Sequence, residues 1–161
     1  MTYQGIISEF KLHAQTLSYS NRLRLIIAIS KDLFSDYKSF SETYRWGNPD
    51  LLLDIIAISE QSLVAEIDIT KIKKLTTELD AIIPDADDFG EYLGSYALNA
   101  SEVVYEALQF ILDGQLIHVI DAGTLYLDTI FLRIKEEGTV PETIVNDHPS
   151  MAKAREFLIQ F

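Results

Sequence analysis

The sequence predicts an all-α fold, a compact single-domain bundle of about six to seven helices spanning residues 1–161. Apolar residues recur at intervals of three and four along most of the chain, which is helical spacing. Only 7 Gly and 4 Pro interrupt 161 residues, so long elements joined by short turns are expected. The apolar fraction of 48% is that of an ordinary globular domain. Residues 62–69 are an exception, because they alternate apolar and polar and could be extended.

The first two helices are predicted from apolar spacing and from residues that cap helices. The first covers roughly residues 2–16. The second starts at Ser20 or Asn21, either of which can cap a helix. A short continuation over 36–44 carries aromatic residues at helical spacing, and a Trp-Gly pair closes it.

The clearest local signal is Asn48-Pro49-Asp50. Asn is a favoured N-cap, Pro is favoured at the first helical position, and Asp suits the positive end of the helix dipole. A helix is therefore predicted from Pro49 to about residue 63. Another starts at Asp68 or Thr70 and ends before Pro84.

The second half contains a short acidic connection and three further predicted helices. The connection covers residues 86–90, and the helices cover about 95–113, 115–137 and 148 to the C-terminus. Gly114 and Gly138 follow the first two of these helices, where a left-handed residue often ends a helix.

Charge is distributed unevenly within the predicted domain. The net charge is −12, which argues against nucleic acid as a partner, because phosphate binding needs clustered Lys and Arg. Residues 75–132 contain eleven acidic residues and no Lys or Arg, whereas residues 1–49 hold six basic and four acidic residues. This pattern fits either a cationic protein partner or simple solubility.

Composition also limits the compartment and the chemistry. The absence of Cys excludes disulfides and thiolate metal sites. Apolar runs stay short of the roughly 18–20 residues of a membrane span, and no secretory signal is visible. We therefore expect a cytoplasmic protein that does not enter a membrane.

Asp85, Asp87, Asp88 and Glu91 form the densest acidic cluster of the chain. Their oxygens could bind a hard cation, but their spacing does not fit a calcium loop. Carboxylates also cap helices and lie favourably near the positive end of the helix dipole. Helix capping is the preferred interpretation.

His118 and Asp121 are neighbours at helical spacing and, with Glu102 or Glu106, could supply metal ligands. A di-iron bundle needs Glu-x-x-His pairs, and no histidine here has Glu three residues before it. Neither a Gly-x-Ser-x-Gly turn nor a Gly-rich phosphate loop occurs. The sequence predicts no catalytic residue, no metal and no cofactor.

The two long helices differ in how their apolar residues are placed. On the helix over 95–113, the polar residues share one narrow stripe and apolar residues fill the remaining surface, so neighbouring helices should surround this helix. The stripe consists of Glu102, Glu106, Gln109 and Asp113. On the next helix, Leu125 and Leu132 lie away from the main apolar face. Another helix covers them, or they contact a partner.

The segment from Ile82 to Tyr92, followed by Ala97-Leu98-Asn99-Ala100, resembles the YjaG-like family of bacterial proteins of unknown function. That family carries a similar Ile-Pro-x-Ala-Asp-Asp-Phe segment before a long helix rich in small and apolar residues. The resemblance covers most of the chain and is strongest over residues 78–114. It implies an all-helical fold without an assigned enzymatic activity, and it transfers no catalytic residue.

These features together predict a non-enzymatic protein-binding domain. We expect an immunity or antitoxin-like protein that neutralises a cationic toxin or effector. The predicted contact residues are acidic: Asp87, Asp88, Glu91, Glu102, Glu106 and Asp113. One alternative is a housekeeping or stress-related helical protein that forms a homodimer. Another is a metal-dependent enzyme that uses the first three of these residues and His118.

Overall fold

Helices account for 81% of the chain in a computed structural model, which describes residues 1–138 and 140–161. No strand occurs in this part of the chain, so the all-α, single-domain prediction is confirmed. Within it, no helix combines the length and the apolar character needed to cross a membrane. The elements are α1 (Tyr3–Thr16), α2 (Tyr19–Tyr44), α3 (Pro49–Gln61), α4 (Ile69–Asp80), the 3₁₀ turn η1 (Ala86–Phe89), α5 (Tyr92–Asp113), α6 (Leu116–Glu137), α7 (Glu142–Asp147) and α8 (Pro149–Ile159).

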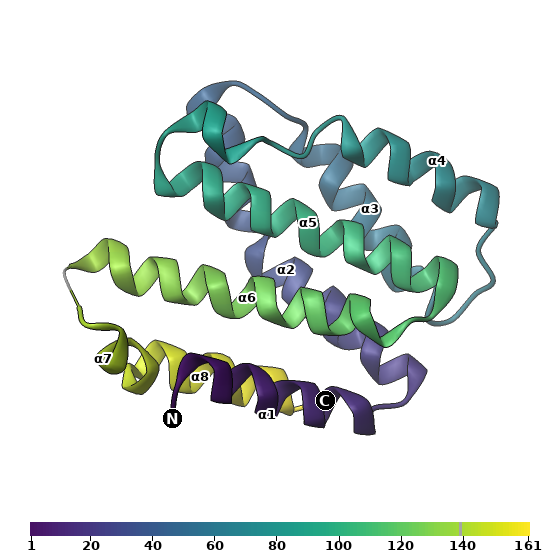
Figure 1. Cartoon of the computed structure of the whole chain (residues 1–161). Coiled ribbons are helices and arrows are strands. Elements are labelled where there is room, and N and C mark those ends of the chain that lie inside the picture. Colours follow the sequence, from purple (N-terminus) through teal and green to yellow (C-terminus); the bar gives the residue numbers. More distant parts are fainter. Residues whose placement is uncertain (139) are drawn as a thin grey trace.

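The helices form two layers (Figure 1). In the nearer layer α4, α5 and α6 lie side by side, and α1 and α8 continue it beyond α6. The second layer consists of α2 and α3, and the long α2 packs against both α5 and α6. As a result α5 is enclosed by α2, α3, α4, α6 and η1. This enclosure agrees with the wide apolar arc of its sequence.

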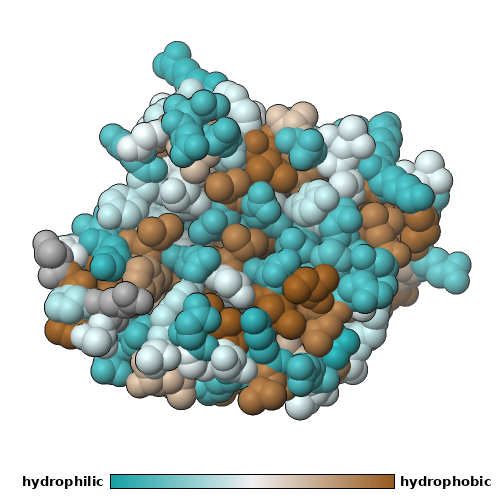
Figure 2. All heavy atoms as spheres, viewed as in Figure 1, coloured by the Kyte–Doolittle hydropathy of each residue, from teal (hydrophilic) through white to brown (hydrophobic). Residues whose placement is uncertain are grey.

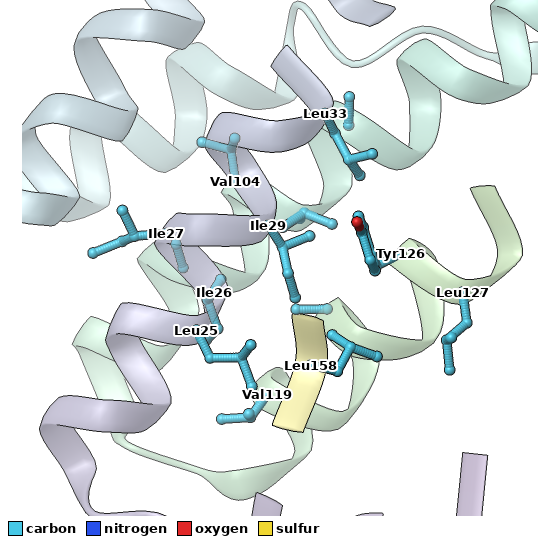
Figure 3. Packing of buried hydrophobic residues seen from close by; sticks show 14 of the residues in the cluster. Leu25, Ile26, Ile27, Ile29, Leu33, Val104, Val119, Tyr126, Leu127 and Leu158 are labelled. Atoms are coloured by element: carbon cyan, nitrogen blue, oxygen red, sulfur yellow. The ribbon is translucent and has the colours of Figure 1, made fainter. Parts of the chain in front are cut away.

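The core lies between the layers and is centred on α2. Its side chains Leu25, Ile26, Ile29 and Leu33 are fully buried. Figure 3 shows the α2 side chains packed with residues of three other helices: Val104 of α5, Val119 and Tyr126 of α6, and Leu158 of α8. Burying such side chains contributes about 1.5–3 kcal/mol each.

Several helix starts follow the predicted capping. The side chains of Asn48 and Asp68 accept backbone N–H groups at the beginning of α3 and α4, as expected. The predicted start of α2 at Ser20 or Asn21 was late, because the hydroxyl of Ser18 caps the helix and accepts the N–H of Asn21 at 3.2 Å. Helix α2 then continues to Tyr44 without a break.

Three further details correct the sequence-based description. Residues 62–69, which could have been extended, contain a turn at 62–64 and lead into α4 at Ile69. Gly114 is left-handed with φ 66°, as predicted, but Gly138 has φ 165°, which is extended backbone. The short helix α7 was not predicted, and its six residues contain too few apolar positions to show a period.

The buried hydroxyl of Tyr37 links two connections that are distant in sequence. It donates to the carbonyl of Ile82 at 2.7 Å and accepts the N–H of Asn48 at 3.2 Å. One contact lies at the beginning of α3 and the other just before the acidic connection. Gly47, with φ 85°, lies against the same ring and leaves no room there for a side chain. Tyr37 thus positions the chain that leads into η1.

Close approach of α1 to α6 depends on Gly123. A Cβ atom at this position would overlap the ring of Phe10, which is only 2% exposed. The ring therefore occupies the space that a side chain on α6 would otherwise fill.

Gly123→Ala should lower the free energy of unfolding by about 1–3 kcal/mol, because the added methyl group displaces a buried ring. In an open helix the same change would stabilise by up to about 1 kcal/mol, so the sign of the effect is diagnostic. Gly138→Ala is the control, since no atom lies within 4 Å of its added Cβ. Denaturant unfolding of the two variants checks this. Equal stability of both would contradict the proposed contact.

Candidate protein-binding face

The acidic connection predicted from sequence forms the 3₁₀ turn η1, and Asp85 is its N-cap residue. Its carboxylate accepts the N–H of Asp87 at 3.0 Å, which is the capping role expected for one member of the cluster. Helix α5 itself begins after Glu91, which makes no side-chain capping bond. Asp87, Asp88 and Glu91 are exposed, and none is joined by an ion pair to another side chain of the described residues.

An aromatic cluster holds η1 in place. The ring of Phe89 lies 4.7 Å from Phe40, 5.0 Å from Tyr44 and 5.7 Å from Trp46, measured between ring centroids. Such pairs contribute about 0.5–1.5 kcal/mol each beyond the area they bury. The acidic side chains are therefore attached to a turn that is anchored in the core and is not a free loop.

A surface hollow of about 440 Å³ lies between η1, the beginning of α5 and α6. We call it the acidic hollow, and seven residues line it: Ala86, Asp87, Gly90, Glu91, Tyr92, Ser95 and Leu132. Two carboxylates thus stand beside an aromatic ring and an aliphatic side chain, and no lining residue is basic. A second hollow, with Lys135 in its lining, adjoins it across Tyr92.

The other predicted contact residues lie further along α5. Its 22 residues span about 33 Å at 1.5 Å per residue, so Glu91 and Asp113 are at opposite ends. The six predicted residues therefore do not form one compact patch. Figure 2 shows the same face as Figure 1, with hydrophilic and hydrophobic side chains interspersed over α5 and α6.

Glu102 lies near the middle of α5 and is partly buried. Burial raises its pKa, and the charges of Asp80 on α4 and Asp121 on α6 raise it further. Three acidic side chains from three helices thus approach one another. The sequence analysis had not connected Asp80 with this group.

His118 bridges two of the predicted contact residues. Its Nδ1 lies 2.6 Å from the Glu106 carboxylate and its Nε2 lies 3.0 Å from that of Asp113. A carboxylate only accepts hydrogen bonds, so both ring nitrogens carry a proton when Glu106 and Asp113 are ionised. The side chains of His118 and Glu106 are only 15% and 12% exposed. Glu106 is therefore a buried partner of His118 and does not lie on the accessible acidic surface.

The pKa values follow from these contacts. Burial alone lowers the pKa of His118, but the hydrogen bonds that its ring donates to the carboxylates of Asp113 and Glu106, together with their charges, outweigh burial and raise the pKa above 6.5. The hydrogen bond with His118 lowers the pKa of Asp113. Burial raises the pKa of Glu106, and His118 opposes part of that rise. These contacts at the turn between α5 and α6 thus favour the protonated form of His118.

The stability of the protein should fall as pH rises above neutrality. A histidine whose folded-state pKa is raised stabilises the fold fully below its unfolded pKa, about 6.5, and this contribution is lost as pH rises through the folded value. Denaturant unfolding between about pH 6 and pH 9 measures the slope. His118→Gln should remove it, because glutamine does not titrate. A variant that keeps the wild-type slope would contradict this role.

A second polar cluster joins α2, α5 and α6 and was not predicted. Arg133 forms an ion pair with Asp36, and the hydroxyl of Tyr96 donates to Glu136 at 2.5 Å. The guanidinium of Arg133 also lies 5.8 Å from the centre of the Tyr96 ring. These groups satisfy one another, so we assign them to the helix packing. A helical wheel of one helix does not show such a cluster, because it is assembled from three.

The residues suggested for a metal-dependent enzyme are not assembled. His118 lies in the first turn of α6, next to the C-terminal end of α5, whereas Asp87, Asp88 and Glu91 lie near the N-terminal end of α5. Across residues 1–138 and 140–161, no group of three or more His, Asp and Glu side chains is arranged to hold a metal ion.

Leu125 and Leu132 have different surroundings. Leu125 is partly buried against the core, so neighbouring helices cover it in part. Leu132 lines the acidic hollow. In the sequence, the position of Leu132 away from the main apolar face of α6 was the feature that indicated a surface here. Tyr92 and Ser95 gave no such signal, because the predicted helix began only at residue 95.

The fold and the site define a small all-α protein with an acidic hollow on its surface. A family described as "Protein of unknown function (DUF416)" matches residues 9–161, so the chain belongs to the DUF416 family. The crystal structure of a DUF416 family protein from Shewanella baltica OS155 is similar, with a TM-score of 0.82 at 20% sequence identity. The match covers 92% of this chain and 80% of that one, and it supports the fold. No curated protein matches the sequence.

Proposed function

We propose that this DUF416 family member is a non-enzymatic protein-binding domain whose acidic hollow receives a basic side chain of a positively charged partner protein. One observation carries the proposal. Asp87 and Glu91 line a single hollow together with Tyr92 and Leu132, and none of the lining residues is basic.

This lining has the chemistry that a Lys or Arg side chain requires. The long apolar stem of such a residue packs on aromatic and aliphatic groups while its charged end stays near solvent. Here Tyr92 and Leu132 would supply the apolar surface, and the carboxylates of Asp87 and Glu91, in the same lining, would pair with the charged end. An arginine also stacks on an aromatic face and pairs with a carboxylate through two hydrogen bonds.

The charge of the whole molecule favours the same class of partner. A net charge of −12 attracts a basic protein and repels nucleic acid and other phosphate-rich surfaces. Exposed Asp88 adds to the field at the hollow, whereas the charge of Asp113 at the far end of α5 is offset by His118. Charges of this kind raise the association rate more than they raise affinity.

An immunity or antitoxin-like role is the more specific form of this proposal. A basic toxin domain acting on nucleic acid has the required charge, and the encounter would take place in the cytoplasm. Support for this form comes from charge alone, and a neighbouring gene for a basic toxin domain would strengthen it. The resemblance to YjaG-like proteins is compatible with the DUF416 assignment and does not select a partner.

Reversing two charges tests the role of the acidic hollow. Asp87→Lys with Glu91→Lys should abolish binding of a short peptide of alternating Arg and Gly, because the hollow then repels guanidinium groups. The matched control is Asp54→Lys with Glu156→Lys, which makes the same change in net charge at exposed positions on α3 and α8.

Backbone amide chemical shifts provide the measurement. The peptide should shift the amides of Gly90 and Ser95 in the wild type and in the control, and it should leave them unchanged in the hollow variant. Added salt should weaken the effect, because exposed charges are screened over about 10 Å at 0.1 M. Equal binding by both double variants would show that the peptide responds only to overall charge, and the proposed site would be discarded.

A further inference from the structure

A second surface lies at the other end of α5, around the connection between α3 and α4. Val64, in this connection, is 87% exposed, and Ile69 at the beginning of α4 is 47% exposed. In Figure 2 hydrophobic side chains gather on the side of the view where α4 begins and α5 ends. Isolated exposed apolar residues are common, but a cluster of them indicates a contact surface.

Val64 forms a ridge between two hollows. One has a volume of about 550 Å³, and its lining includes Arg24, Ala57 and Glu60. The other has a volume of about 410 Å³, and its lining includes Tyr19 and Ile111. Leu63 and Val64 line both. A projecting apolar side chain and a recess of matching character therefore lie next to each other on one surface.

The charges around the first hollow balance one another. Arg24 and Glu60 both line it, and Lys31 forms an ion pair with Glu60. In a molecule of net charge −12, this surface carries both signs close together. Two copies that meet here bring basic groups as well as the acidic Glu60 and Glu66 to the interface, whereas two copies that meet at the acidic hollow bring acidic groups without basic ones.

We propose that a second copy of this chain docks on this surface, and that the two copies form a symmetric dimer. In a two-fold interface the same patch faces itself, so a ridge must lie beside the recess that receives its counterpart. Val64 of each copy enters the hollow of the other. A two-fold axis that passes beside the ridge brings the two hollows together, so that Arg24 of one copy can pair with Glu60 of the other. The acidic hollow, at the far end of α5, stays free for another partner.

Sedimentation of the full chain tests this proposal. The wild type should change from monomer to dimer as its concentration rises from about 1 µM to about 300 µM, a range in which weak specific dimers dissociate. Val64→Asp should weaken dimerisation at least about tenfold, because a charge then enters an apolar recess. The side chain is exposed, so the melting temperature at low concentration should not change.

Two controls separate this surface from others. Leu12→Asp replaces an apolar residue that is 66% exposed on α1, and it should leave the dimer intact. Arg24→Glu should weaken the dimer, and the added change Glu60→Arg should restore it. A wild type that stays monomeric throughout, or a Leu12→Asp variant that dissociates equally, would overturn the proposal.

The dimer and the acidic hollow are tested separately. Asp87→Lys with Glu91→Lys should retain the wild-type dimer, because these residues lie at the opposite end of α5. Loss of dimerisation in that variant would place the interface at the acidic hollow and would contradict both assignments.

Discussion

Enclosure of α5 is the constraint from which the remaining arrangement follows. Helices α2, α3, α4 and α6 pack around it, together with η1, and only a narrow stripe of its surface is left open. Charged residues on a buried helix are costly unless they are paired, so the acidic residues of α5 are restricted to that stripe. Glu106 is almost buried, and the structure accommodates its carboxylate because His118 pairs with it. The acidic surface is thus a product of the packing and not only of composition.

The aromatic contacts of Phe89 and the hydroxyl of Tyr37 explain how an exposed turn can present acidic groups in a defined position. Both attach the segment between α4 and α5 to the second layer of the fold. A flexible acidic loop would lose conformational entropy on binding. An anchored turn loses less, so its carboxylates are better suited to selecting a particular arrangement of basic residues. This anchoring supports the proposed binding role of the turn.

Sequence reasoning was most successful where the signal is local. Asn48, Asp68 and Gly114 marked helix ends correctly, because a cap or a left-handed glycine acts within one turn of the chain. It was least successful where helices distant in sequence meet. The pairing of Glu106 with His118 needs the geometry of the turn between α5 and α6. The contribution of Leu132 to the hollow needs α6 to lie beside η1, and no periodicity within one helix contains that information.

The contact between Phe10 and Gly123 has a consequence for the outer edge of the fold. The Phe10 ring of α1 packs against Gly123 of α6, and this contact fixes both the position of α1 along α6 and its rotation about its own axis. A contact of this kind preserves its register even when the covalent connection is cut. The first helix is therefore suited to fragment complementation: a separate peptide carrying residues 1–16 would find its own position on a shortened chain, and its rebinding would report on the integrity of α6.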